Sequence, residues 1–219
     1  MRNIKRYSLI ATILLFSAGA FAQGLNKYGQ IITNPAAYLN KNGAVGSTTG
    51  LSKSGQQFNV PPAPGVPYQG GTIVYIFQNG DAGYVAGETH GLIASNEDVG
   101  YSQWGCRGTT TAATGIAIGT GSSNTALIMA SCSDANIPAK LCADYRGGDY
   151  TDWYLPSKDE LKKIYLSRSL LSNVNSYLYW SSSEFSSAET WRQNLSVGNG
   201  SQQQFGKNSN SHVRAMRTF

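Results

Sequence analysis

Beyond residue 70, short apolar stretches alternate with glycine-rich turns, and this pattern predicts the order of the structural elements. β-Branched and aromatic positions predict strands at 72–77, 83–86, 91–94, 177–181, 191–195 and 212–219. Between these two groups, apolar positions at helical spacing predict helices at 124–130, 137–145 and after Ser157. Strands, then helices, then strands within fewer than 150 residues indicate an α+β domain.

The helix after Ser157 has the clearest local signal. Ser157 and Glu160 have the spacing of a capping box, in which the serine hydroxyl accepts from the glutamate amide and the glutamate reaches back to the serine amide. Leu161 and Ile164 then mark an apolar helical face. Pro156 closes the strand before this helix, so its start is predicted to within a residue or two.

The neighbouring residues predict which side of a strand two tryptophans and two arginines occupy, and whether they are buried. Trp153 and Trp180 lie in hydrophobic strand patterns and are expected in the core. Arg214 and Arg217 alternate with apolar residues, and a strand without a bulge is expected to place both opposite Met216.

Residues 1–22 have the composition of a secretory signal peptide. Arg2, Lys5 and Arg6 precede the apolar run 9–16, and the sequence Ala-Phe-Ala at 20–22 fits a cleavage site. The apolar run is too short to span a bilayer comfortably. We therefore expect an exported chain without a membrane span, which is secreted, held at the cell surface or kept in the periplasm.

Residues 23–70 contain a degenerate repeat of the form Leu-Asn/Ser-Lys-x-Gly. Its copies begin at Leu25, Leu39 and Leu51, and each predicts a strand end that enters a tight turn. The proline-rich stretch 61–67 predicts a semi-rigid spacer that breaks regular structure. A stalk or oligomerising fibre and a flexible linker are the alternatives for the repeats. The predicted organisation is a signal peptide at 1–22, repeats and linker at 23–70, and a domain at 71–219.

The charge of the chain argues against nucleic acid as a partner. Charged residues make up 13% of the sequence, against about 25% in an average domain. Loss of the three basic residues of the signal would leave 14 Lys and Arg against 12 Asp and Glu, a net charge of +2. No basic cluster exceeds the pair Lys162 and Lys163, so the electrostatic footprint of a nucleic-acid-binding protein is missing.

Three cysteines, Cys106, Cys132 and Cys142, follow the signal segment. Export permits a disulfide, and three cysteines allow three pairings. Cys142 lies inside a helical pattern and is expected to be a small buried hydrophobic residue. We therefore favour a disulfide between Cys106 and Cys132. A zinc site is the alternative, although the sequence has no CxxC pair.

Several ordered motifs extend across the predicted domain. They are 88–93 (ETHGLI), 104–106 (WGC), 152–161 (DWYLPSKDEL), 179–184 (YWSSSE), Trp191 and 213–219 (VRAMRTF). Together they resemble the Lcl C-terminal domain family, named after a collagen-like surface adhesin of Legionella in which the domain mediates attachment to surface polysaccharides. The resemblance implies a C-type-lectin-like fold of short twisted strands with two to three helices, related to formylglycine-generating enzymes. The N-terminal repeats resemble those of secreted Bacteroidetes proteins.

The fold resemblance extends to the targets of diversity-generating retroelements, in which a C-terminal lectin-like face carries variable residues. Residues 184–212 are rich in Ser, Asn and Gln around Trp191, as in a surface of adaptable polar groups with an aromatic anchor. An ordinary polar loop region is the alternative. The candidate ligand-binding residues are Trp191, Gln193, Asn199, Gln203 and Asn208.

Lectin-like folds often bind Ca²⁺, and three aspartates near a Gly-Gly pair are candidate ligands. These residues are Asp144, Asp149 and Asp152. The sugar-binding Glu-Pro-Asn and Trp-Asn-Asp motifs of calcium-dependent lectins are missing from the sequence. Turn and capping roles for the aspartates are therefore the alternative, and no other cofactor is expected.

The sequence gives no support for an enzyme. His90 and His212 are the only histidines, and neither has a recognisable Ser-His-Asp spacing. Formylglycine-generating enzymes use a late pair of cysteines, and no cysteine follows Cys142. The segment 119–124 (GTGSSN) could hold an anion at a helix N-terminus, but it lacks the third glycine of a dinucleotide fingerprint, and helix capping by serine is favoured.

The primary hypothesis is therefore a secreted or cell-surface binding and adhesion module that recognises a glycan or a protein. One alternative is a structural fibre or matrix component, in which the N-terminal repeats assemble a homo-oligomer. The other is an enzyme of the formylglycine-generating type, which the missing late cysteines disfavour.

Overall fold

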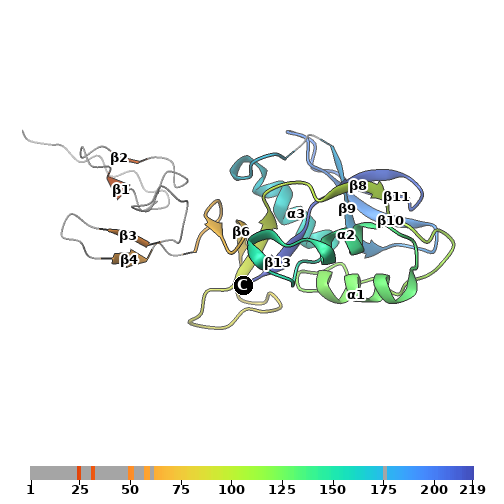
Figure 1. The fold of residues 1–219 in the computed structure, drawn as a ribbon, viewed down its shortest axis with the longest axis horizontal. Helices are drawn as coiled ribbons and strands as arrows, with labels where there is room; N and C mark the ends of the chain where they lie inside the picture. The colour runs from red at the N-terminus through yellow and green to blue at the C-terminus, as the bar shows by residue number, and fades with distance from the viewer. Residues whose placement is uncertain (1–23, 26–30, 33–48, 52–56, 60–61, 175–176) are drawn as a thin grey trace, which may run out of the picture. The chain divides into compact units, whose positions relative to one another are not determined.

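The computed structural model describes residues 24–25, 31–32, 49–51, 57–59, 62–174 and 177–219 (Figure 1). The predicted signal peptide lies outside the described residues. The chain divides into two compact units, 1–34 and 35–219. Among the described residues, no helix has both the length and the apolar character needed to cross a membrane.

The repeats contribute two short antiparallel strand pairs, one in each unit. In the first unit, β1 (Gly24–Leu25) pairs with β2 (Ile31–Ile32). In the second unit, β3 (Thr49–Leu51) pairs with β4 (Gln57–Asn59). The leucines of the first and third repeat copies thus end strands, as the repeat pattern predicts. The second copy and the turns themselves lie outside the described residues.

The domain that follows is an α+β structure built on two sheets. The antiparallel four-stranded sheet has the order β13-β7-β6-β5, with β5 (Pro67–Tyr68), β6 (Gly71–Ile76), β7 (Gly91–Ser95) and β13 (Met216–Thr218). The five-stranded sheet has the order β11-β10-β9-β12-β8, with β8 (Gly100–Gln103), β9 (Leu178–Glu184), β10 (Glu189–Asn194), β11 (Gln202–Gly206) and β12 (Asn210–Val213). Its strands are antiparallel except for β9 and β12, which run parallel.

Three α-helices lie between the two groups of strands in the sequence. They are α1 (Gly121–Ser131), α2 (Pro138–Asp144) and α3 (Lys158–Leu166). Short 3-10 turns follow at Gly147–Asp149 and Arg168–Leu170. Figure 1 shows the five-stranded sheet at one end of the domain and β6 with β13 at the other. The predicted capping box of α3 is confirmed, because Ser157 and Glu160 exchange both hydrogen bonds.

Two apolar clusters form the core. One contains Trp104, Trp153 and Trp180, which confirms the predicted burial of the last two. The other places the apolar face of α3, with Leu161 and Ile164, against residues of the sheets. Cys106 and Cys132 form the favoured disulfide, with Sγ–Sγ 2.03 Å, and Cys142 is a free buried thiol. Burial raises the pKa of that thiol well above its ordinary value.

Two strand predictions are wrong, and the strands β5, β8 and β11 were not predicted. Residues 83–86 form turns rather than a strand, and their apolar side chains Tyr84 and Val85 are exposed. The predicted strand 212–219 is two strands, β12 and β13, which belong to different sheets. The unpredicted strands β8 (GYSQ) and β11 (QQQFG) carry polar and small residues, because each forms an edge of its sheet.

The break between β12 and β13 also overturns the prediction for the arginines. Arg214, Met216 and Arg217 are all buried. Arg214 donates to the Ser95 carbonyl, and its Nε lies 3.1 Å from Asp98 Oδ1. Arg217 forms a bidentate salt bridge with Asp152, in which Nε donates to Oδ1 at 2.8 Å and Nη2 donates to Oδ2 at 2.9 Å. No continuous strand joins these residues, since β12 ends at Val213 and β13 begins at Met216. Even in a continuous strand, a period of two would place Arg214 on the same face as Met216 and only Arg217 on the other, so the prediction was wrong on both grounds.

The C-terminal part of the proline-rich stretch packs on the domain and does not act as a separate spacer. Pro67 and Tyr68 form β5, and Val66 is buried in the core. The Gly65 amide donates to the Ile73 carbonyl, and the Ile73 amide donates to the Val66 carbonyl. The folded domain therefore includes residues that precede 71.

Candidate ligand-binding face

Trp191 lies on β10, next to the outermost strand of the five-stranded sheet. Its cross-strand partner in β11 is Gln204. The partly buried indole meets the Phe185 ring edge to face, with centroids 5.8 Å apart. The Lys158 ammonium lies 5.2 Å from the indole centroid, within reach of a cation–π interaction.

The start of α3 fixes Lys158 beside the indole. The Lys158 amide donates to Ser183 Oγ at 2.9 Å, and the Lys158 carbonyl accepts from Gln202 Nε2 at 2.7 Å. These bonds join the helix to β9 and to β11. We call Trp191, Phe185, Lys158, Gln202 and Gln204 the Trp191 face. It combines two aromatic rings, one cation and two amides on a rigid support.

The structure does not bring the predicted site residues together on this face. Gln203 is one residue away from the partner of Trp191, so strand alternation points it to the opposite face, with Arg192 and Phe205. The Arg192 guanidinium lies 3.3 Å from the Phe205 ring centroid. Gln193 is fully buried, and its amide Nε2 donates to the Gly200 carbonyl at 2.7 Å. Gln193 therefore has a structural role and cannot meet a ligand.

Asn199 and Asn208 are exposed but lie at opposite ends of β11. Asn199 is in the turn between β10 and β11, and Asn208 is in the turn between β11 and β12. A five-residue strand is about 17 Å long. Of the five predicted ligand residues, only Trp191 thus belongs to the Trp191 face. Residues 184–212 are mostly strands of one sheet, not the loops that the composition predicted.

The candidate calcium ligands do not form a ligand set. Asp144 pairs with Lys140 at 3.1 Å, and Asp152 pairs with Arg217. The Arg217 hydrogen bonds hold the pKa of the Asp152 carboxyl below its ordinary value. Asp149 stands alone and exposed at a positive φ of 63°. In the described part of the chain, the one group of potential ligand atoms is Cys106, Cys132 and Asp134, and its two sulfurs are bonded to each other.

A buried ion pair, Lys207 with Glu184, fixes the loop behind the Trp191 hairpin. Both side chains are almost fully buried. The Glu184 carboxylate also accepts from the amides of Thr111 and Ala112, and Lys207 Nζ donates to the Thr109 carbonyl at 2.8 Å. Both charges are thus used to hold backbone, which favours a structural role for the pair over a catalytic one.

The glycine-rich segment before α1 binds the carboxylate of Glu160 rather than an external anion. Glu160 Oε1 accepts from the Gly119 amide at 2.7 Å, and Oε2 accepts from the Ser157 amide at 2.8 Å. A Cβ at Gly121 would lie 2.2 Å from Glu160 Oε2, so only glycine allows this approach. Burial raises the pKa of Glu160, although the backbone donors act in the opposite direction. The predicted serine cap of α1 is absent, since Thr120 occupies the N-cap without a side-chain bond.

Contacts within the domain hold both histidines. The His90 ring nitrogens lie 3.0 Å from the Phe219 carbonyl and 2.7 Å from Glu88 Oε2, and these partners raise the His90 pKa. His212 stacks on the Tyr177 ring at 4.9 Å, and its Nδ1 lies 3.0 Å from Asp98 Oδ2. Neither histidine lies beside a serine or cysteine nucleophile among these contacts.

The sequence missed Phe185 and Lys158 as members of the Trp191 face. Lys158 is 33 positions away from Trp191 and carries only the signal of a helix start. Phe185 follows β9 and, with 50% exposure, breaks the polar pattern around it. An exposed aromatic residue in a serine-rich turn was the one signal that could have pointed to it.

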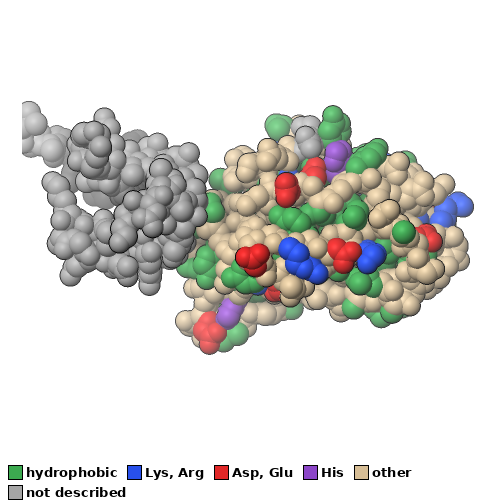
Figure 2. All heavy atoms as spheres, in the orientation of Figure 1, with side chains coloured by type: hydrophobic (Ala, Val, Ile, Leu, Met, Phe, Trp, Pro, Cys, Tyr) green, Lys and Arg blue, Asp and Glu red, His purple; other side chains and the backbone are tan. Residues whose placement is uncertain are grey.

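The described residues define a disulfide-bonded α+β domain with an exposed aromatic and amide face. On the side seen in Figure 2, acidic and basic side chains are few and interspersed. No known protein family and no curated protein matches the chain. Among solved structures, it is similar to a fimbrial protein from Bacteroides ovatus, with 14% identity and a TM-score of 0.47. The match covers 78% of this chain and 48% of the fimbrial protein, so the chain spans about half the length of that protein.

Proposed function

We propose that the protein is an exported, non-enzymatic binding and adhesion module of the Lcl C-terminal, C-type-lectin-like kind. Its ligand is a glycan or a protein on a neighbouring surface, and its contact surface is the Trp191 face. The observation that carries the proposal is the position of Trp191. A partly exposed indole stands between Phe185 and Lys158. Aromatic anchors with amides around them are typical of binding surfaces that combine stacking with hydrogen bonding.

The use of the ionisable side chains also supports binding rather than catalysis. Glu160, Glu184 and Lys207 each hold backbone groups, and Asp152 is paired with Arg217. A catalytic acid or base needs a proton-accepting or proton-donating atom that faces a substrate. Glu160, Glu184 and Lys207 instead direct their polar atoms into the fold, and both oxygens of Asp152 accept from Arg217.

A glycan-array screen with the full-length protein tests the proposal. Trp191→Ala should lower the affinity for the glycan at least about tenfold, because the sugar ring can no longer stack on the indole. The buried core is untouched by this change. Phe205→Ala is the matched control, since Phe205 is an exposed aromatic residue of the same hairpin on the opposite face. Equal binding by Trp191→Ala and the parent would contradict the proposed face. Repeating the screen with EDTA tests the calcium hypothesis, and unchanged binding would contradict it.

The alternative, a structural fibre component, rests on the strand pairs that the repeats form. Sedimentation velocity over a range of concentrations separates it from the binding module. Assembly that disappears when residues 23–61 are removed would favour the fibre. A monomer at every concentration would contradict it.

A further inference from the structure

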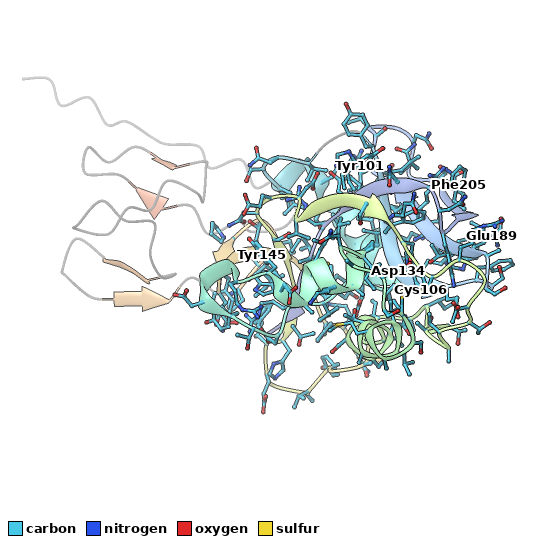
Figure 3. The ribbon with its side chains drawn as sticks, turned by 45° about the vertical axis from the view of Figure 1, so that its right-hand side comes forward. Tyr101, Cys106, Asp134, Tyr145, Glu189 and Phe205 are labelled. Atoms are coloured by element: carbon cyan, nitrogen blue, oxygen red, sulfur yellow. A yellow bond between two sulfur atoms is a disulfide. The ribbon has the colours of Figure 1, made fainter. Side chains whose placement is uncertain are left out.

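A hollow of about 420 Å³ lies beside the disulfide and shares no lining residue with the Trp191 face. Its lining residues are Ser102, Gln103, Gly105, Asp134, Ala135, Asn136, Ile137 and Asn210. In Figure 3, Asp134 and Cys106 lie together near the middle of the domain, whereas Glu189, which begins β10, lies at the far end. The volume falls within the range of small-molecule sites. We propose that this hollow binds a neutral saccharide.

Three separate segments of the chain build the hollow. β8 contributes Ser102 and Gln103, and β12 contributes Asn210, which is the cross-strand partner of Gln103. The third wall is the segment 134–137, between the disulfide and α2. Because Gln103 and Asn210 are register partners, their side chains emerge from one face of the ladder within about 5.5 Å of each other at Cβ. The two amides can therefore reach the same ligand.

The hollow is held in shape by covalent and close contacts. The disulfide joins the β8 end to the segment before α2, and Asp134 Oδ2 accepts from the Cys106 amide at 2.8 Å. Gly105 has a φ of +92°, and a Cβ there would lie 2.5 Å from Ile137 Cγ2. Only glycine permits this approach of the two walls. A preformed site loses less conformational freedom when it binds.

The lining chemistry matches a ligand with many hydroxyl groups. Gln103, Asn136 and Asn210 are exposed amides, and each offers both donors and acceptors. Ser102 lies one residue from Gln103 on β8, so strand alternation points its hydroxyl to the opposite face of the sheet, and the three amides carry the recognition. A sugar hydroxyl can donate and accept at once, so it can pair with both ends of an amide.

The charge of the lining indicates a neutral ligand. Asp134 is the one ionisable residue among the lining residues, and no Lys or Arg accompanies it. A phosphate, sulfate or uronate ligand would meet this carboxylate without a compensating cation, and like charges repel. Ala135 and Ile137 add apolar surface, which suits the C–H face of a sugar ring. A neutral pyranose thus fits the amides, the apolar side chains and the charge of the lining.

Calorimetric titration of the full-length, disulfide-bonded protein tests this inference. The probes are the methyl glycosides of glucose, galactose, mannose and N-acetylglucosamine, with methyl glucuronoside as the anionic counterpart of glucose. We expect at least one neutral glycoside to bind and the glucuronoside to bind more weakly than the glucoside. Asn210→Ala and Gln103→Ala should each weaken binding about tenfold, the effect of losing a hydrogen bond to a ligand hydroxyl. Both side chains are exposed, so these variants should fold.

Asn208→Ala is the matched control, because Asn208 is an exposed amide two positions from Asn210 that does not line the hollow. It should bind as the parent does. The inference is overturned if none of the neutral glycosides binds the folded parent, or if Asn210→Ala and Gln103→Ala bind as tightly as Asn208→Ala. Loss of binding in Trp191→Ala alone would also overturn it, while supporting the Trp191 face. The two proposals therefore fail separately.

Discussion

Lys207 and Glu184 show how single residues in this domain use charge to hold the chain. The pair is sealed from solvent, and the Lys207 ammonium also lies 4.6 Å from the Trp104 ring centroid. Removal of one partner leaves an uncompensated buried charge, which costs far more than the pair contributes. The pair therefore determines the conformation of the loop at 109–112 more than it adds to the net free energy of unfolding.

Lys207→Met should lower the free energy of unfolding by about 3–5 kcal/mol, because it leaves the Glu184 carboxylate charged and buried. The double variant Lys207→Met/Glu184→Gln should lose less, since it removes the unpaired charge and keeps a carbonyl oxygen for the Thr111 amide. Urea unfolding at neutral pH measures both. A double variant less stable than the single variant would contradict this account.

Glu160 and Asp152 should give the stability opposite dependences on pH. Burial raises the pKa of Glu160 above 4.5, so its ionised form is penalised in the folded state. Its contribution is greatest below that ordinary value and falls as pH rises through the raised pKa. Arg217 lowers the pKa of Asp152 below 3.8, so that contribution is present above 3.8 and is lost as pH falls through the lowered pKa.

Urea unfolding across the acidic range checks these signs, with Glu160→Gln and Asp152→Asn compared to the parent. The stability advantage of the parent over Glu160→Gln should shrink as pH rises above 4.5. Its advantage over Asp152→Asn should shrink as pH falls below 3.8. Differences that are constant with pH would show that neither carboxyl is shifted.

At the scale of the elements, the Cys106–Cys132 disulfide and the edge strand β5 each stabilise the folded domain. The disulfide joins residues 26 positions apart. It closes a loop that contains all of α1, and it joins the two segments that carry the lining residues Gly105 and Asp134 of the proposed saccharide hollow. Because the loop is long, the bond restricts the unfolded chain strongly.

Cys106→Ser/Cys132→Ser should therefore lower the free energy of unfolding by about 3–4 kcal/mol. Denaturation with and without a reductant measures the effect. The parent should lose a similar amount when reduced, whereas the double variant should not respond. A response of the double variant to reductant would show that the effect does not arise from this bond.

The position of β5 predicts that a domain cut at residue 71 is damaged. A chain that begins at 71 lacks the buried Val66 and the backbone bonds between 65–66 and Ile73. It should be about 2–4 kcal/mol less stable than a chain that begins at 62, from the burial of one valine side chain and two hydrogen bonds. Comparison of their urea midpoints checks this. Equal midpoints would restore the sequence-based boundary.

At the scale of the domain, residues 62–219 carry 11 Lys and Arg against 12 Asp and Glu, so the formal charge is close to zero. The side seen in Figure 2 shows no patch of one charge. Ligand binding at the Trp191 face should therefore depend weakly on ionic strength, because stacking and amide hydrogen bonds are screened little by salt. We expect less than about a threefold change in affinity between 50 and 500 mM NaCl. A tenfold loss would indicate an electrostatic ligand and contradict the proposed contact chemistry.

The sequence by itself determined those features whose signals are local. The capping box at Ser157 needs only residues three apart, and the three helices need only apolar spacing over two or three turns. Cys106–Cys132 could be favoured because Cys142 lies within a helical pattern. Trp153 and Trp180 could be assigned to the core from their apolar neighbours. Each of these predictions depends on the chain within a few residues.

The tertiary structure alone decided which distant residues meet. Glu160 fills the anion site before α1 from 41 positions away, and Lys158 reaches Trp191 across 33. β8 and β11 are strands because neighbouring strands supply their hydrogen bonds, although their own residues are mostly polar or small. The five predicted ligand residues lie on different faces and in different turns of the sheet. Strand register decides these positions, and composition does not encode register. Contacts at long sequence separation are set by the packing of whole elements, and no local pattern contains them.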